Sequence, residues 1–424
     1  MITKSRIYIL IILAFTGFGY AALAPSIYYI YFFLFLIFLY LTEIKKFKIK
    51  YNSSELNKFM LVVLPFAAIL IYQYFNPASI PLSILIDQCG KLFLYFFISY
   101  MILKRIKQDF HIVFIDIMYF LTIVSLILYP TQFYIPLQEV IKETFGSIIS
   151  PLGFSSGDVS DKYISKTLFF FTYHHNYGHP YTGIPRNCGA FWEPGVFGFF
   201  LVLALAFNTM ISGKNILSTR NLVFIIAIFT TFSTTAVLAT FLVFTYYFLI
   251  NSKISLGKRI TVVTLLILIF FNGVWQLDFI SGKIFQKIED ADSDMGSRFG
   301  AVLYHLLLVK DNLFTGVGLK YVFEGKNELF DYKKSAPNGI SFLLMYWGML
   351  GLVFYLIVLY AGIRNWIANT YNSVGLHHNF IFFLLLFLSF SQSLTIKIFF
   401  VFLLSMFIVF DSKKPDNMEQ VKTL

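Results

Sequence analysis

The sequence predicts an all-α, polytopic integral membrane protein with about 12 transmembrane helices and two large outer loops that contain interfacial helices. Hydrophobic residues make up 58% of the 424-residue chain and charged residues 13%, and the mean hydropathy is +0.74. Long apolar runs recur from one end to the other, for example at residues 27–41 and 340–360. A run of about 20 apolar residues crosses the hydrocarbon core as a helix, whereas membrane strands would show short alternating segments.

The expected spans follow one another along the whole chain, which we treat as a single transmembrane domain, 1–424. They cover residues 7–22, 26–42, 59–75, 84–103, 111–129, 195–212, 221–233, 236–250, 260–277, 339–362, 379–391 and 397–410. Two of the apolar stretches, 221–250 and 379–410, are too long for one upright helix, and each has a polar centre. We interpret both as hairpins of short helices. A single tilted helix at 221–250 is the alternative, and it would reverse the orientation of the next loop.

The distribution of positive charge predicts the orientation. With the N-terminus inside, the segments that face the cytoplasm hold nearly every lysine and arginine that flanks a span, and Lys397 is the exception. This is the positive-inside pattern. It places both termini in the cytoplasm and accounts for the net charge of +11 without nucleic-acid binding. Two long loops, 130–190 and 278–337, are then on the outer side.

Arg186 and Arg298 are the two of the seven arginines that this topology places outside. Arginine grips phosphate or carboxylate with a planar fork of donors that lysine lacks. Pro194 suits the first position of the helix that follows Arg186, so the positive end of that helix is expected close by. Arg186 and this helix end could therefore bind an anion. The simpler alternative is an arginine at the lipid headgroup boundary.

The second outer loop carries Arg298 at the head of an amphipathic stretch, 298–310, whose apolar residues recur at helical spacing. This pattern predicts a helix at the membrane surface. A turn with Gly316 and Gly318 follows, and Asn338 precedes the next span. An N-cap is the simplest role for Asn338. A similar apolar pattern within 137–148 predicts another interfacial helix in the first loop.

Histidines and tyrosines crowd the first outer loop, namely Tyr173, His174, His175 and His179 together with Tyr177 and Tyr181. No carboxylate or cysteine lies at a spacing that would complete a metal site, so we predict no metal. Aromatic rings that stack on sugars, with histidines bonded to hydroxyl groups, are one reading. A packed loop without a chemical role is the other.

Charged residues also lie within the predicted spans. Asp87 and Lys91 are four residues apart on one face of the fourth span, and Asp116 lies in the fifth. Charges inside a membrane are candidates for function. They would be the critical residues of a proton-coupled transporter, and the alternative is that they form ion pairs that fix the packing of helices.

The order of motifs in the second half of the chain resembles the O-antigen polymerase and O-antigen ligase superfamily. The motifs are an arginine, an amphipathic helix, the sequence Gly316-Val317-Gly318, an asparagine, and a span that includes Trp347-Gly348-Met349-Leu350-Gly351. The stretch 186–195 also resembles polymerases of the Wzy type. The ligase branch commonly has His-Asn where this chain has Pro337-Asn338, which favours the polymerase.

This resemblance implies a glycosyltransferase that polymerises oligosaccharide repeat units carried on undecaprenyl diphosphate, at the outer face of the bacterial inner membrane. It needs no cofactor. Donor and acceptor are both lipid-linked, and membrane lipids, a chain-length regulator and a flippase are implied as partners. The alternatives are a ligase that transfers glycan to lipid A core, and a flippase for lipid-linked oligosaccharide. The catalytic candidates are Arg298, Arg186, Glu193 and His305, and the substrate-binding candidates are Tyr173, His174, His175, His179, Tyr304, Gly316, Gly318 and Asn338.

Overall fold

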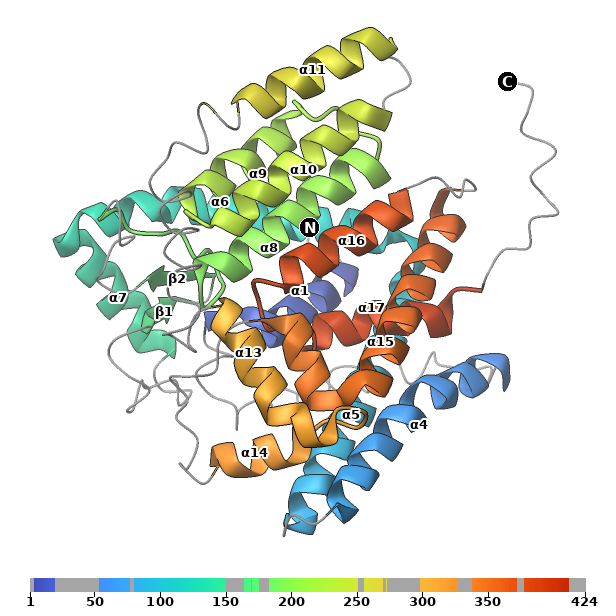
Figure 1. Ribbon diagram of the computed structural model, residues 1–424. Helices are drawn as coiled ribbons and strands as arrows, with labels where there is room; N and C mark the ends of the chain where they lie inside the picture. The colour runs from blue at the N-terminus through green and yellow to red at the C-terminus, as the bar shows by residue number, and fades with distance from the viewer. Residues whose placement is uncertain are drawn as a thin grey trace. The chain divides into compact units, whose positions relative to one another are not determined.

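The computed structural model describes eleven stretches of the chain. They are residues 4–19, 53–76, 80–149, 164–168, 170–174, 183–250, 255–269, 272, 298–326, 338–371 and 377–411. In these stretches the structure is almost entirely helical, with one two-stranded β-sheet (Figure 1). The prediction of a mainly helical protein is confirmed. The predicted span 26–42 lies outside the described residues.

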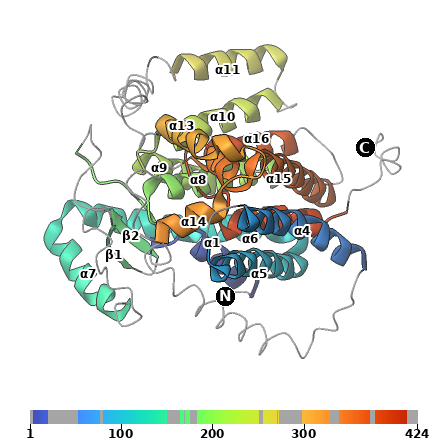
Figure 2. The ribbon, with the colours of Figure 1, turned by 60° about the horizontal axis from the view of Figure 1, so that its bottom comes forward.

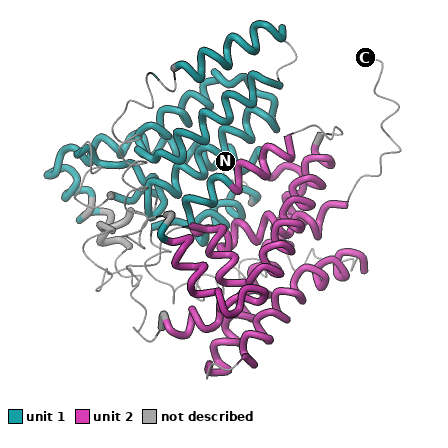
Figure 3. Tube along the Cα trace, in the orientation of Figure 1, with its two compact units in different colours: residues 1–50, 111–300, 387–392 teal, residues 51–110, 301–386, 393–424 magenta. Residues whose placement is uncertain are grey.

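The chain divides into two compact units, each assembled from segments that are distant in sequence (Figure 3). Unit 1 comprises residues 1–50, 111–300 and 387–392, and unit 2 comprises residues 51–110, 301–386 and 393–424. That the whole chain forms a single transmembrane domain stays a prediction.

Unit 1 is built around α8 (Pro194–Ala206), in which every residue is buried. Its other long helices are α1 (Lys4–Gly17), α6 (Phe110–Leu128), α9 (Thr219–Thr230), α10 (Thr234–Ile250) and α11 (Leu256–Ile269). A π-helical turn, 207–211, extends α8. Figures 1 and 2 show α8, α9 and α10 side by side. Gly198 allows this close packing, because a Cβ there would lie 2.7 Å from the Cβ of Ala236 in α10.

The segment 130–190, predicted to be the first outer loop, contains α7 (Ile135–Ile149) and an antiparallel hairpin of β1 (Ile164–Leu168) and β2 (Phe171–His174). Both views of the ribbon place α7 beside the hairpin (Figure 2). Phe171 and Tyr173 are fully buried and pack against Leu128 and Ile141. The helix was predicted from its apolar pattern, whereas the hairpin was not.

Unit 2 is built from α4 (Ser53–Phe75), α5 (Leu82–Ile106), α13 (Arg298–Val309), α14 (Gly318–Lys326), α15 (Gly339–Tyr371), α16 (His377–Ser389) and α17 (Ile398–Val409). The boundary between the units falls within α13 and α16, so each of these two helices has a few residues in unit 1. The helix predicted at 298–310 is present as α13, and its place at the membrane surface stays a prediction. The short helix α14 was not predicted. Breaks between α9 and α10, and between α16 and α17, confirm the two predicted helix pairs.

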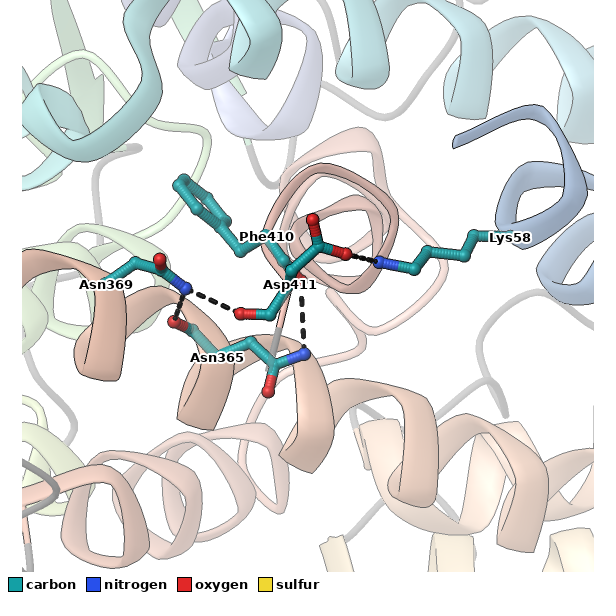
Figure 4. Close-up of polar contacts among 5 residues, drawn as sticks. All are labelled: Lys58, Asn365, Asn369, Phe410 and Asp411. Atoms are coloured by element: carbon teal, nitrogen blue, oxygen red, sulfur yellow. Dashed lines mark hydrogen bonds and ion pairs between the residues drawn. The ribbon is translucent and has the colours of Figure 1, made fainter. Parts of the chain in front are cut away.

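One end of unit 2 brings together helix ends that the sequence places on the cytoplasmic side (Figure 4). Asn365 Nδ2 donates to the carbonyl oxygen of Phe410 at 3.1 Å, and Asn369 Nδ2 donates to that of Asp411 at 2.8 Å. The carboxylate of Asp411 pairs with Lys58. These bonds join the start of α4 to the ends of α15 and α17.

The other end of unit 2 holds segments that the sequence places outside. Gln73, near the end of α4, donates to the carbonyl oxygen of Thr315 at 2.5 Å. Asn76 donates to the side chain of Asn312 at 2.8 Å. The contacts at the two ends of α4 are therefore consistent with the predicted topology. Which end faces the cytoplasm stays a prediction.

Four helical stretches among the described residues are long and apolar enough to cross a membrane, namely Ser53–Phe75, Leu82–Phe133, Pro194–Ile211 and Gly339–Thr370. The second stretch contains both α5 and α6, joined by a 3-10 turn at Lys107–Asp109. Shorter apolar helices coincide with other predicted spans. The structure therefore supports a membrane-embedded protein, and the number of 12 spans stays a prediction.

Candidate functional site

The segment 186–193 of unit 1 is fixed to its surroundings by backbone hydrogen bonds. The amide of Asn187 donates to the carbonyl oxygen of Thr230 at 2.9 Å, and its side chain donates to the hydroxyl of Thr230 at 3.0 Å. On the other side, Trp192 N donates to Gly17 O at 3.0 Å. The end of α1 and the turn between α9 and α10 therefore hold this segment in one conformation.

Arg186 is partly buried, and its Nε donates to the carbonyl oxygen of Thr231 at 3.0 Å. The two terminal nitrogens of this guanidinium bond to no residue in the described part of the chain. Burial lowers the pKa of Arg186, and the nearby carboxylate of Glu193 opposes that shift. Arginine stays charged in proteins. The result is a cation that is held by its inner nitrogen while its outer donors remain available.

Glu193 and Pro194 form the start of α8. Pro194 is the first helical residue, as the sequence predicted, and Glu193 occupies the N-cap position. The Glu193 side chain does not cap the helix, and it forms no ion pair with Arg186. The first amide groups of a helix have no partner within it. The start of α8 therefore presents unsatisfied backbone donors and the positive end of the helix dipole.

Arg298 is the first residue of α13. The structure describes its backbone, and its side chain lies outside the described part. The joint action of Arg298 and Arg186 on one diphosphate stays a prediction.

His305 lies on the buried face of α13, with 1% of its surface exposed. Its Nδ1 lies 2.8 Å from the hydroxyl oxygen of Ser341, in the first turn of α15. Burial lowers the pKa of His305 to about 4. The imidazole is therefore neutral near pH 7, and it is a weaker base than a free histidine. Tyr304, its neighbour, is partly exposed.

Asn338 caps α15, as the simplest reading of the sequence predicted. Its Oδ1 accepts hydrogen bonds from the amides of Ile340, at 3.2 Å, and Ser341, at 3.0 Å. Its side-chain nitrogen is buried and has no partner within the described residues. The cap explains the residue type, and a substrate contact stays a prediction.

Gly316 and Gly318 lie where two backbones meet. The helix α15 is interrupted at Gly348, where φ is 68° and ψ is −177°, and the turn at 312–318 packs into this interruption. Val317 N donates to Met345 O at 2.8 Å. A Cβ at Gly316 would lie 2.5 Å from the amide nitrogen of Gly348. Packing alone therefore requires these glycines, and their role in substrate binding stays a prediction.

Tyr173 is fully buried, and its hydroxyl lies 2.9 Å from that of Thr131. Burial raises the pKa of Tyr173. This environment supports the packed-loop alternative for Tyr173. The backbone of His174 belongs to β2, but its side chain lies outside the described part, as do His175 and His179. Their contact with sugars stays a prediction.

Asp87, Lys91 and Asp116, the charged residues singled out within the predicted spans, are paired. Asp116 accepts from Arg6 at 2.6 Å and from Arg220 at 2.8 Å. Lys91 lies 2.8 Å from Asp87, one helical turn away. These contacts favour the ion-pair alternative over proton-coupled transport.

Two residues in contact with Arg186 or with the start of α8 were not identified from the sequence. Thr231 contributes a backbone carbonyl, which any residue type could supply. The identity of residue 231 therefore does not indicate its contact with Arg186. Gln392 is buried next to Gly195 in α8. The sequence marked Gln392 only as part of a polar turn, because nothing in a single sequence indicates a contact between positions so far apart.

Comparison with known proteins gave one family match, over residues 219–356, to a family model described as O-antigen ligase. The matched segment covers less than half of the chain, and it includes Arg298, His305, Gly316, Gly318 and Asn338 but not Arg186 or Glu193. No curated protein and no solved structure matches the chain. The match over residues 219–356 confirms the resemblance of this protein to the O-antigen polymerase and ligase superfamily.

Proposed function

We propose that this protein polymerises oligosaccharide repeat units carried on undecaprenyl diphosphate, at the outer face of the bacterial inner membrane. A hydroxyl group of the acceptor unit attacks the anomeric carbon of the donor glycan. The bond between that carbon and the diphosphate oxygen breaks, the lipid diphosphate leaves with the bonding electrons, and the hydroxyl proton passes to a base. The protein must therefore bind an anionic leaving group and accept a proton.

The observation that carries this proposal is the state of Arg186. Its Nε is held by Thr231 while its terminal nitrogens bond to no described residue, and it lies close enough to Glu193, at the start of α8, for their charges to interact. A guanidinium fixed in this way loses little freedom when it binds phosphate. Charge that grows on the departing diphosphate would be stabilised by donors that are already in place.

Arg298 is proposed as the second cation of the site. It lies at the start of α13 within the segment that matches the O-antigen ligase family. The resemblance supports this role, since an arginine precedes the amphipathic helix in that superfamily.

Glu193 is the better of the two candidates for the base. Its carboxylate is partly exposed next to Arg186. His305 is almost fully buried and bonded to Ser341, and its pKa of about 4 makes it a poor proton acceptor near neutral pH. We therefore assign proton transfer to Glu193 and a structural role to His305.

A ligase that passes glycan to lipid A core is the second candidate, because the matching family model is described as O-antigen ligase. The replacement of the ligase His-Asn pair by Pro337-Asn338 favours the polymerase. A flippase is the third candidate function. The ion pairs of Asp87 and Asp116 do not support it, because they favour a structural role for these charges over transport.

The glycan profile of a deletion strain tests the proposal. For a polymerase of lipopolysaccharide, we expect single repeat units on the lipid A core in place of a ladder. Complementation with Arg186→Ala, Arg298→Ala or Arg298→Lys should leave that profile unchanged, although each variant reaches the membrane. A normal ladder with these variants would refute the assignment of the site. Unattached polymer in the deletion strain would indicate a ligase, and loss of single units would indicate a flippase.

A further inference from the structure

We propose that Gln392 donates a hydrogen bond from its side-chain amide to a phosphate oxygen bound at the start of α8. Gln392 would thus be a further residue that binds the donor diphosphate. The inference rests on the proposed function, and it extends that site to the turn between α16 and α17, which lies outside the segment matched by the family model.

Gln392 has a buried donor that no described residue satisfies. The residue is 1% exposed, and its Nε2 has no hydrogen-bond partner in the described part of the chain. The backbone of the turn is well held, since Ser391 N donates to Leu388 O at 3.1 Å and Gln392 N donates to Ser389 O at 3.3 Å. Buried polar groups are nearly always bonded. The Gln392 amide is therefore a donor that a ligand can satisfy, since no described residue does so.

This amide lies at the first turn of α8. A Cβ added to Gly195 would overlap Nε2 of Gln392, and it would lie 3.0 Å from Oε1 of Glu193. Gly195 is the second residue of α8, where the backbone amide has no partner within the helix. The structure therefore places an unsatisfied side-chain donor next to unsatisfied backbone donors. Only glycine at position 195 leaves room for this arrangement.

The charge of the surroundings selects the ligand class. The donors here are the Gln392 amide and the first backbone amides of α8. The guanidinium of Arg186 is a third donor, since its charge interacts with the carboxylate of Glu193 at the start of this helix. Donors at the positive end of a helix dipole favour an anion with several oxygen atoms. Phosphate groups fit this description, and an uncharged sugar hydroxyl would not use the dipole. Glu193 adds one negative charge, which the guanidinium of Arg186 offsets.

Binding of inorganic pyrophosphate to the purified full-length protein in detergent tests the inference. The readout is the rise in Tm with pyrophosphate concentration, each variant being compared with its own ligand-free Tm. We expect Gln392→Leu and Gln392→Glu to weaken the apparent affinity about tenfold or more, since each loses a hydrogen bond to a charged group. Gly195→Ala should act in the same direction by displacing the amide.

Gln132→Leu is the matched control. Gln132 is also a glutamine of unit 1, 7% exposed, and neither its side-chain nitrogen nor its oxygen has a partner among the described residues. It lies in the turn after α6, and we place it in no site. This variant should respond to pyrophosphate as the wild type does.

Gln392→Leu separates anion binding from helix capping, because leucine neither accepts hydrogen bonds from the amides of α8 nor donates to an anion. If Gln392 only capped the helix, Gln392→Leu would free those amides and bind pyrophosphate at least as tightly as the wild type, and the inference would be overturned. Gln392→Glu also adds a negative charge next to the anion, so its weaker binding combines repulsion with the lost hydrogen bond. If all Gln392 variants bound pyrophosphate as the wild type does while Arg186→Ala lost this binding, the inference would be overturned and the proposed function would stay intact. Absence of any response in the wild type would overturn both.

Discussion

Nε of Arg186 donates to the carbonyl oxygen of Thr231 at 3.0 Å, and Thr231 directly precedes Phe232, whose φ is 46°. A bulky residue in the left-handed region costs on the order of 1–3 kcal/mol and persists only where its surroundings fix it. Here Asn187 bonds to Thr230 on the same turn. The strained turn thus presents a carbonyl group that orients the guanidinium.

This geometry predicts that lysine cannot replace arginine at position 186. Lysine has no nitrogen equivalent to Nε, and its single ammonium group cannot bond Thr231 and a phosphate as a planar fork does. We expect Arg186→Lys to slow polymer formation by about 10²–10³-fold, as much as Arg186→Ala. The measurement is the rate of chain extension from lipid-linked repeat units in isolated membranes.

Arg364→Lys is the control for this experiment, because Arg364 is exposed on α15 near the predicted cytoplasmic end. It should extend chains at the wild-type rate. If Arg186→Lys were substantially active while Arg186→Ala was inactive, a positive charge at position 186 would be sufficient for chain extension, and the planar fork of donors would not be required.

The contact between the turn at 312–318 and the interruption of α15 predicts a stability effect. Gly316 has φ of 74°, and a Cβ there would meet the backbone of Gly348. We expect Gly316→Ala and Gly348→Ala each to destabilise the folded protein by at least about 1–2 kcal/mol, the cost of the backbone conformation alone. The temperature at which the detergent-solubilised protein loses its monodisperse form would fall.

Gly90 provides the comparison for these two glycines. It lies in α5, and nothing lies within 4 Å of a Cβ built there. Gly90→Ala should be neutral or stabilising by up to about 1 kcal/mol, because alanine favours the helix. A loss of stability as large as in Gly316→Ala would mean that the close backbone contact is not the cause.

The pairing of Asp116 with two arginines predicts a structural role. In Asp116→Asn, Arg6 and Arg220 lose the carboxylate that separates their charges. We expect less folded protein in the membrane, with normal chain extension per molecule. The measurement is ladder intensity divided by the amount of protein on an immunoblot. Abolished activity at a normal protein level would instead favour a transport mechanism.

The sequence predicted the elements whose signals are local. Apolar runs marked the helices, and the polar centre at 233–235 marked the break that separates α9 from α10. Pro194 marked the start of α8 because its ring suits only the first turn of a helix. The β1–β2 hairpin was missed although Phe171 and Tyr173 alternate, because four residues carry too little pattern to distinguish a strand from a loop.

The candidate site was predicted less completely, because it depends on contacts between distant segments. Arg186 was identified from its position relative to the predicted membrane. Its partner is a backbone carbonyl some 45 residues away in sequence, and backbone groups leave no trace in residue identity. Gly316 was assigned to substrate binding because Gly316-Val317-Gly318 is one of the motifs that carry the family resemblance. The structure shows that contact with Gly348 is enough to require a glycine there.

The environment of His305 predicts a dependence of stability on pH. Its folded-state pKa is about 4, below the value of about 6.5 for an unfolded chain. Between these values the unfolded state binds a proton that the folded state does not, so stability falls as the pH falls. The difference corresponds to about 3 kcal/mol, fully present above pH 6.5 and lost by about pH 4.

His305→Asn removes this titration and keeps a side-chain oxygen that can accept a hydrogen bond from Ser341. Other groups titrate over the same range, so the relevant quantity is the difference in Tm between the wild type and the variant at each pH. We expect the wild type to lose stability relative to the variant as the pH falls from 7 to 4, and the difference to be constant between pH 7 and 8. A constant difference over the whole range would show that His305 is not kept neutral by its burial against Ser341.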